Sequence, residues 1–203
     1  MAAPLLSAVA DIIDEGGFAA VVAAAGRGEH SGLTDLFRVY QPMLLRYLRA
    51  RDPVLADDLA SEVWVAVARR LGGFVGDERG FRSWLFTIAR CRLIEHRRKL
   101  ARRRTDPVSH DRLDRLERPP AQSGGDDPAV LLVERMTAQA ALDAVVADLT
   151  SDQAEAVLLR VIAGFDVGET ARIMRRSPGS VRVLCHRALR QLAMSLTQEV
   201  GAE

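Results

Sequence analysis

The sequence predicts an all-α protein made of two small helical domains joined by a flexible linker. Apolar residues recur at spacings of three and four along most of the 203-residue chain, which is the periodicity of helices with one buried face. The sequence contains no Asn-Gly hairpin signal and no sustained alternation of apolar and polar residues, so nothing in it predicts strands. A proline- and glycine-rich stretch divides the helical pattern into two parts.

Three amphipathic helices are predicted in the N-terminal domain, residues 33–104. The first covers residues 33–50, with Pro42 at a possible bend, and the second covers residues 54–71, opened by acids and closed by glycines. The third covers residues 80–104. The side chains expected on their buried faces are Leu33, Leu36, Phe37, Tyr40, Leu44, Tyr47 and Leu48, then Leu55, Leu59, Val63, Val67 and Leu71, then Phe81, Trp84, Leu85, Ile88, Ala89 and Ile94. Residues 1–32, acidic and alanine-rich, form an N-terminal extension that we expect to add a helix packed on this domain or bound to a regulator.

The helical pattern stops in the middle of the chain, where residues 105–129 are predicted to form the linker. Four prolines, a Gly-Gly pair and mixed charges occur between Thr105 and Pro128. Fully extended, such a stretch could span up to ~80 Å. We therefore expect two compact units on a long tether.

Capping signals locate the helices of the C-terminal domain, residues 130–203. Thr150 with Gln153, and Asp166 with Glu169, have the spacing of capping boxes. Ser177 followed by proline predicts the start of the last helix. The apolar residues of the first two helices are Leu142, Val145, Val146 and Leu149, then Val157, Leu158, Val161 and Ile162.

The last two predicted helices have the plan of a helix-turn-helix, in which the second helix enters the major groove of DNA. Six arginines and no acidic residue occur between Thr170 and Gln198. The expected core face of the last helix comprises Val181, Cys185, Ala188 and Leu192. The residues expected to contact duplex DNA are Ser177, Ser180, Arg182, Val183, His186, Arg187 and Arg190. A solvated arginine face on an ordinary helical bundle is the alternative interpretation.

Charge is segregated in the N-terminal domain as well. The helix that contains Phe81 to Arg104 has nine basic residues and one acidic residue, more than compensation of a helix dipole requires, which favours a nucleic-acid backbone as partner. Aromatic residues at its start are typical of single-strand binding, although the spacing of Trp84 favours the core. The preceding helix has acids at its N-terminus, away from its apolar face, where a protein partner could dock.

Several function classes are excluded or weakened by the sequence. The net charge is only +1, and no uncharged run is long enough to cross a bilayer, so we expect a soluble cytoplasmic protein without membrane insertion. Two cysteines provide neither a disulfide framework nor a metal cluster. Walker, GxSxG, HExxH and CxxC motifs are missing and the four histidines lie far apart, so we expect no enzyme, no metal and no cofactor.

Three segments resemble the extracytoplasmic-function (ECF) sigma factors of the sigma-70 family. FRSWLFTIAR (81–90) with IEHRR (94–98) is similar to region 2, and ADDLASEVW (56–64) is similar to the acidic helix that this family docks on RNA polymerase. Residues 149–192, notably ETA (169–171), GSVR (179–182) and HRA (186–188), are similar to region 4. The resemblance covers about residues 33–104 and 130–196.

The resemblance implies a factor that binds core RNA polymerase, recognises promoter DNA and helps open it for transcription initiation. Two promoter elements about two helical turns apart, at ~34 Å per turn, lie within the reach of the linker. An anti-sigma protein covering both domains is a further partner that the resemblance allows. The implied region 2 contacts to the opened strand are Arg82, Trp84, Arg90, Cys91, Glu95, Arg97 and Arg98. The implied contacts to polymerase are Asp57, Asp58, Ser61 and Glu62.

The chain departs from the usual family pattern at Cys91, Ser61 and Leu184, so the promoter sequence it prefers cannot be carried over. The alternative function is a helix-turn-helix regulator that binds DNA without polymerase. Such regulators usually dimerise, and the sequence has no heptad repeat for that purpose. Co-purification with core polymerase would separate the two functions.

Overall fold

The computed structural model describes residues 15–105 and 149–200, and within them the side chains of residues 17–102 and 149–194. All regular structure in these ranges is helical, which confirms the all-α prediction. The predicted linker, residues 105–129, and the predicted helix lined by Leu142 to Leu149 lie almost wholly outside the described residues. The elements in chain order are α2 (Glu15–Gly26), α3 (His30–Arg49), α4 (Ala56–Arg70), η1 (Leu71–Gly73), α5 (Glu78–Thr105), α7 (Ser151–Val161), α8 (Val167–Met174) and α9 (Pro178–Val200).

Helices α3, α4 and α5 pack together and correspond to the three helices predicted for the N-terminal domain. α3 continues through Pro42 in one helix. Nearly all of the predicted apolar residues are buried or half-buried, but Phe37 was placed on the wrong face and is 41% exposed. Its ring lies against Trp64 at 5.3 Å between centroids, so it covers the core from outside.

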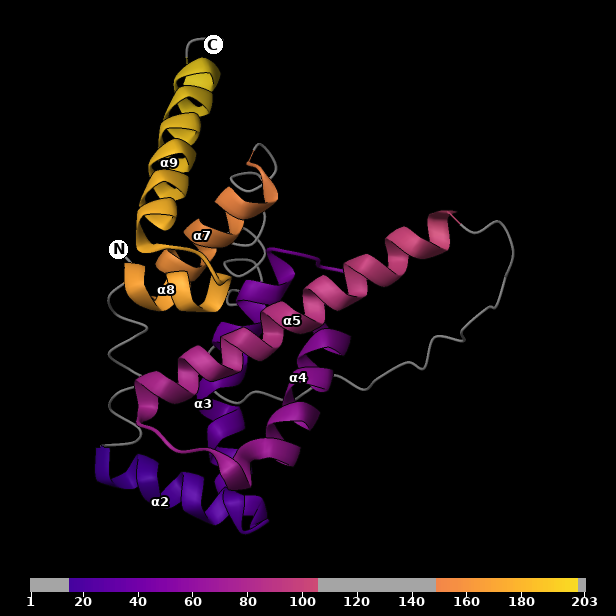
Figure 1. The fold of residues 1–203 in the computed structure, drawn as a ribbon, viewed down its shortest axis with the longest axis vertical. Helices are drawn as coiled ribbons and strands as arrows, with labels where there is room; N and C mark the ends of the chain where they lie inside the picture. Colours follow the sequence, from indigo (N-terminus) through magenta and orange to yellow (C-terminus); the bar gives the residue numbers. More distant parts are fainter. Residues whose placement is uncertain (1–14, 106–148, 201–203) are drawn as a thin grey trace, which may run out of the picture.

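Helix α2 belongs to the N-terminal extension and packs on α3 (Figure 1). Phe18 is buried and meets Phe81 edge-on at 5.8 Å between centroids. The backbones of α2 and α3 come so close at Gly32 that a Cβ atom there would lie 2.6 Å from the Val21 carbonyl oxygen. The extension therefore adds a helix that packs on the three-helix unit, which was one of the two expectations for these residues.

Both predicted capping boxes are present in the C-terminal unit. The Gln153 N–H donates to Thr150 Oγ1 at 3.4 Å, and the Thr150 N–H donates to Gln153 Oε1 at 2.9 Å. The Asp166 carboxylate begins α8 in the same way, accepting from the Glu169 N–H at 2.8 Å. Val161, predicted to be buried, is 51% exposed, because it lies with Arg160 on the outer face of the chain here, while Ile162 and Ala163 after it turn toward the core.

In the described residues, the main cluster of buried apolar side chains extends across both units, and a smaller cluster lies within the C-terminal unit. Figure 1 shows α5 between α2–α4 on one side and α7–α9 on the other, and α5 contacts α8. Phe86 of α5 is completely buried between Tyr47 and Phe165, at 5.3 and 5.2 Å between ring centroids. The sequence predicted two separate compact units on a tether. In this conformation they lie in direct contact, because Phe165 and its neighbours cover a face of α5 that the first unit leaves open.

Candidate nucleic-acid interface

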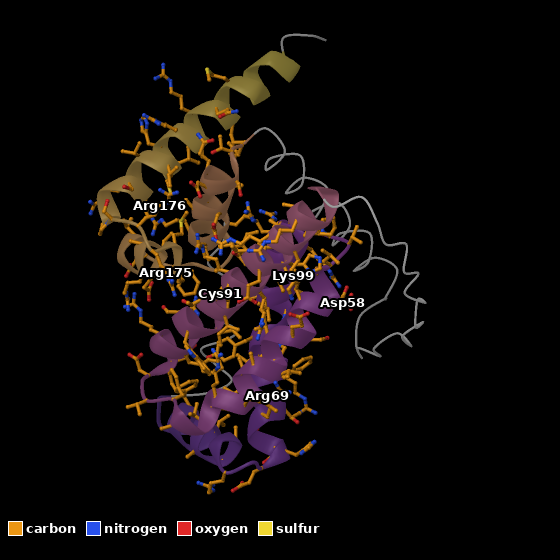
Figure 2. The ribbon with its side chains drawn as sticks, turned by 45° about the vertical axis from the view of Figure 1, so that its right-hand side comes forward. Asp58, Arg69, Cys91, Lys99, Arg175 and Arg176 are labelled. Carbon is orange, nitrogen blue, oxygen red and sulfur yellow. The ribbon has the colours of Figure 1, made fainter. Side chains whose placement is uncertain are left out.

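Helices α8 and α9 form the predicted helix-turn-helix, with Arg175 and Arg176 at the turn (Figure 2). Arg175 takes the left-handed conformation, with φ of 54°, and this ends α8. Ser177 Oγ then accepts the Ser180 N–H at 3.1 Å, as expected of the residue that begins α9. Arg176 does not point freely to solvent, because its guanidinium pairs with Asp152 at the start of α7.

The outer face of α9 is exposed along the part of the helix whose side chains are described. The seven residues predicted to contact duplex DNA are all exposed: Ser177, Ser180, Arg182, Val183, His186, Arg187 and Arg190. Within residues 17–102 and 149–194, no carboxylate forms an ion pair with the three arginines of this set. Unpaired guanidinium groups on an exposed helix that follows a capped turn are suited to phosphate and guanine contacts.

The inner face of α9 anchors it to α7 and α8. Val181 and Ala188 are fully buried, while Cys185 and Leu192 are half-buried. Burial raises the pKa of the Cys185 thiol above its ordinary value, so this thiol stays protonated at neutral pH. The predicted division of α9 into a core face and an exposed face is therefore the one observed.

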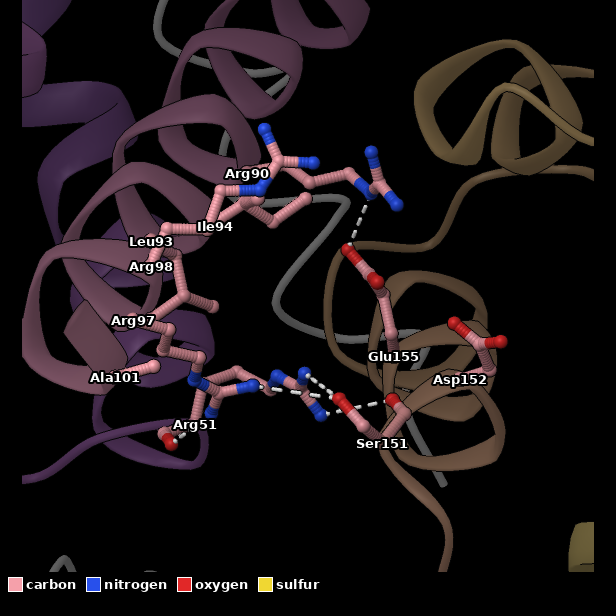
Figure 3. A pocket seen from close by; sticks show the side chains of 10 residues that line it. All are labelled: Arg51, Arg90, Leu93, Ile94, Arg97, Arg98, Ala101, Ser151, Asp152 and Glu155. Carbon is pink, nitrogen blue, oxygen red and sulfur yellow. Dashed lines mark hydrogen bonds and ion pairs between the residues drawn. The ribbon is translucent and has the colours of Figure 1, made fainter. Parts of the chain in front are cut away.

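Three of the basic residues predicted on α5 are engaged by the C-terminal unit. Arg82 donates through Nη2 to the Ala163 carbonyl oxygen at 2.6 Å, and Arg90 Nε lies 2.8 Å from Glu155 Oε1. Arg97 donates to Ser151 Oγ at 3.3 Å (Figure 3). Arg97 also donates through Nη2 to the Arg51 carbonyl oxygen of its own unit at 2.8 Å, so Arg82 and Arg90 are the two that the C-terminal unit holds most closely.

The other residues predicted on α5 have mixed surroundings. Trp84 is half-buried and packs on Phe74 with ring centroids 5.3 Å apart, which fits the core role that its spacing favoured. Cys91 is a half-buried free thiol. Glu95 accepts from Arg92 Nη1 at 3.0 Å, and Arg98 is exposed.

The acidic residues of α4 share an exposed face, where Asp58 is visible at the edge of the molecule in Figure 2. Asp57 lies 3.4 Å from Arg49, and Glu62 lies 4.0 Å from Arg92. Ser61 donates through Oγ to the Asp57 carbonyl oxygen at 3.0 Å. Asp57, Asp58, Ser61 and Glu62 are thus brought together on a surface whose negative charge is partly balanced.

Sequence reasoning missed the residues that join the two units. Arg79 contacts Asp166 and Glu169, each at 3.0 Å. Arg51 donates to the Ser151 carbonyl oxygen at 3.0 Å. Glu155 is buried on α7 although it carries a charge. A glutamate two positions before the predicted apolar residues of α7 was a signal in the sequence that this surface has a charged partner.

Within residues 15–105 and 149–200, no three His, Cys, Asp or Glu side chains come together to hold a metal ion. Among the helices of these residues, none is long and apolar enough to cross a membrane.

Comparison with protein families gives two matches in the same chain. Residues 36–103 match Sigma-70 region 2, and residues 139–192 match Sigma-70, region 4. The first match contains α4 and nearly all of α5, and the second contains α7, α8 and most of α9.

Three curated relatives are similar over most of this chain. The ECF RNA polymerase sigma factor BldN of Streptomyces coelicolor is 34% identical over 183 residues, covering 88% of this chain and 66% of BldN. The ECF RNA polymerase sigma factor ShbA of Streptomyces griseus is 33% identical, covering 85% of this chain and 92% of ShbA. SigD of Mycobacterium tuberculosis, a further ECF RNA polymerase sigma factor, is 30% identical, covering 85% of this chain and 81% of SigD.

Two solved structures have the same fold. CnrH, in complex with the cytosolic domain of CnrY, superposes with a TM-score of 0.62 at 21% identity, covering 88% of this chain and 96% of CnrH. The sigma factor RpoE of Bartonella quintana, in complex with the anti-sigma factor NepR, superposes with a TM-score of 0.57 at 23% identity, covering 80% of this chain and 97% of RpoE.

Proposed function

Because this chain belongs to the ECF sigma factors of the sigma-70 family, we propose that it binds core RNA polymerase and directs promoter recognition, DNA opening and transcription initiation. The observation that carries the proposal is the presence of both sigma regions, in order, with a capped helix-turn-helix whose outer arginines have no ion-pair partner among the residues that the structure describes. The protein spans only 66% of the length of BldN but most of ShbA.

We assign duplex recognition to α9. Arg182, Arg187 and Arg190 are exposed on one face of this helix, together with His186. In a helix-turn-helix the N-terminal part of the second helix reaches base edges, while cations farther along meet phosphates. We therefore propose that Arg182 contacts bases and that Arg190 contacts the backbone of the upstream promoter element.

The basic face of α5 is proposed to capture the unpaired strand of the downstream element. Arg82, Arg90, Arg97 and Arg98 provide its positive charge, and a cationic track with nearby aromatic residues suits an unstacked strand. Opening would then be driven by strand binding, so the proposed role needs no catalytic residue and no nucleotide hydrolysis.

The exposed acids of α4 are proposed to dock on polymerase. Asp58 has no ion-pair partner among the described residues, whereas Asp57 and Glu62 have partners that are themselves exposed or half-buried. Charges at the rim of an interface act mainly on the rate of association and on specificity. An anti-sigma protein is a further proposed partner, since RpoE was solved with the anti-sigma factor NepR and CnrH was solved with the cytosolic domain of CnrY.

Run-off transcription with purified core polymerase and a library of promoters tests this function. We expect transcripts only when both core enzyme and this protein are present. A helix-turn-helix regulator acting without polymerase would bind DNA but would neither co-purify with core enzyme nor direct transcripts, and that result would overturn the proposal.

A further inference from the structure

The side chains proposed to capture the opened strand are the same ones that the C-terminal unit occupies. Arg82 bonds to the Ala163 carbonyl oxygen and its guanidinium lies 5.3 Å from the centroid of the Phe165 ring. Arg90 pairs with Glu155, and Arg97 bonds to Ser151. Each contact occupies N–H donors that a phosphate would also use, and Arg82 and Arg90 are half-buried as well, so the contacts seen here compete with strand binding by these arginines.

Glu155 is the central residue of this contact surface. Its side chain is only 5% exposed, and its partners come from the other unit: Arg90 at 2.8 Å and the Tyr47 hydroxyl, which donates to Glu155 Oε1 at 3.2 Å. A buried carboxylate is costly unless it is paired and hydrogen-bonded. We call the conformation in which the two units are in contact the closed arrangement. Glu155 favours it, because Arg90 and the Tyr47 hydroxyl compensate the cost of burying its charge.

Apolar contacts reinforce the ionic ones. Phe86 and Phe165 meet nearly at right angles, with centroids 5.2 Å apart and an interplanar angle of 77°, and both rings are almost completely buried. Separating the units would expose both rings to water, which opposes separation. The surface thus combines a specific buried charge pair with an aromatic contact.

The closed arrangement covers one functional face and leaves the others open. Arg79, at the rim, pairs with Asp166 and Glu169, the two residues that cap α8. In contrast, the outer arginines of α9 and the acids of α4 are exposed. Core polymerase could therefore dock on α4 before the strand-binding face of α5 becomes accessible.

We propose that region 4 inhibits region 2 within the free protein through an arginine clasp, defined as Arg79, Arg82, Arg90 and Arg97 against Glu155 and the loop from Ala163 to Asp166. The clasp keeps α5 from binding single-stranded DNA until the two regions separate. The proposal rests on the proposed function for the identity of the ligand. The closed state itself can be measured without reference to transcription.

The first test measures closure in the full-length free protein. Spin labels are attached at Val65→Cys on α4 and Leu189→Cys on α9, both exposed positions, in a background carrying Cys91→Ala and Cys185→Ala. We expect one narrow distance distribution for this protein. Adding Glu155→Lys, which sets a like charge against Arg90, should broaden and lengthen it. A broad distribution before that substitution would overturn the proposal.

Two further variants separate opening from misfolding. Arg79→Glu removes the rim pairs from the region 2 side and should open the protein in the same way as Glu155→Lys. Exchanging the buried pair, with Arg90→Glu and Glu155→Arg together, should restore the narrow distribution that either change alone abolishes. Failure of the exchange to restore closure, or an unchanged distribution in Arg79→Glu, would contradict the clasp.

The second test measures strand binding by fluorescence anisotropy with a labelled random-sequence single-stranded DNA at fixed salt. If closure limits the competent population to about 1–10%, Glu155→Gln should tighten binding roughly 10- to 100-fold. Glu29→Gln, a matched change at an exposed glutamate outside the clasp, should leave binding unchanged. Opening without tighter binding would overturn the proposal. Tighter binding without run-off transcripts would support the clasp and contradict the proposed function instead.

Discussion

Arginines of this protein occupy two contrasting environments. Arg187 is exposed on α9 with no carboxylate nearby among the described residues, whereas the Arg90 side chain is only 16% exposed and pairs with Glu155. Both lie in basic stretches of sequence, so local composition does not distinguish them. The difference comes from what packs on each helix, and it decides which arginines can meet DNA in the closed protein.

Arg187→Ala is expected to weaken binding of duplex promoter DNA by the holoenzyme. Loss of one phosphate contact should reduce the slope of log binding constant against log salt concentration by ~0.9. The measurement is a salt titration followed by anisotropy or footprinting. Arg38→Ala, at an exposed arginine of α3, is the matched control and should leave the slope as it is. An unchanged slope for Arg187→Ala would place this residue outside the interface.

Helices of this protein differ in how far their own sequence determines their ends and faces. The caps of α7 and α8 are local, since Thr150 and Asp166 each bond to a residue three positions later, and both were predicted. The burial of Phe86 and Glu155 was not predicted, because it depends on contacts with residues far away in the sequence. Tyr47 and Glu155 are 108 positions apart, and no periodicity within one helix encodes such a pair.

The same distinction applies to the candidate site. The exposure of the seven α9 residues expected to contact DNA followed from the spacing of the apolar residues, whereas the exposed Leu189 and Met194 were not among the predicted residues. The basic face of α5 was predicted as a charged surface, but its coverage by α7 and the following loop was not. Sequence patterns within one helix report which face is polar, and they do not report whether another domain lies on that face.

The close approach of α2 and α3 gives a prediction at the scale of the element. Gly32→Ala should destabilise the protein by roughly 1–3 kcal/mol, because the added Cβ overlaps backbone atoms of α2 and the helices must separate. This outweighs the gain of roughly 1 kcal/mol that alanine brings to a helix. Urea unfolding measures the difference. Gly73→Ala, where a Cβ meets nothing within 4 Å, is the control and should be nearly neutral.

The cap of α8 predicts a pH dependence. The Glu169 backbone N–H bonds to the Asp166 carboxylate and holds the pKa of that carboxyl below its ordinary value, with Arg79 acting in the same direction. Its contribution to stability is therefore present above the unfolded pKa of aspartate, ~3.9, and is lost as the pH falls through the lower folded pKa. The unfolding midpoints of wild type and Asp166→Asn should differ at neutral pH and converge in acid. A constant difference would contradict this role.

At the scale of the whole molecule, a net charge of +1 conceals a segregated distribution. Acids gather on one face of α4, and the outer face of α9 carries arginines that pair with no carboxylate in the described part of the chain, while many of the charges between the two units neutralise one another. The closed protein thus offers two charged surfaces of opposite sign, while Arg82 and Arg90, on the face of α5 proposed to bind the unpaired strand, are half-buried against the C-terminal unit. Such a distribution favours an order of events, with polymerase docking first and strand capture after the units separate.

In this proposed order, the acids of α4 act in the docking of polymerase and take no part in closure. Asp58→Lys should weaken binding to core polymerase roughly tenfold, mainly by slowing association, because a reversed rim charge acts on the encounter of the two proteins. Surface-plasmon resonance with immobilised core enzyme measures the association rate at two salt concentrations. Asp35→Lys, a charge reversal on α3, should leave that rate unchanged.

The distance between spin labels on α4 and α9 should be the same in both variants, since neither residue touches the clasp. A normal association rate for Asp58→Lys would mean that polymerase approaches from another face, and a change in the label distance would mean that α4 and the clasp are coupled.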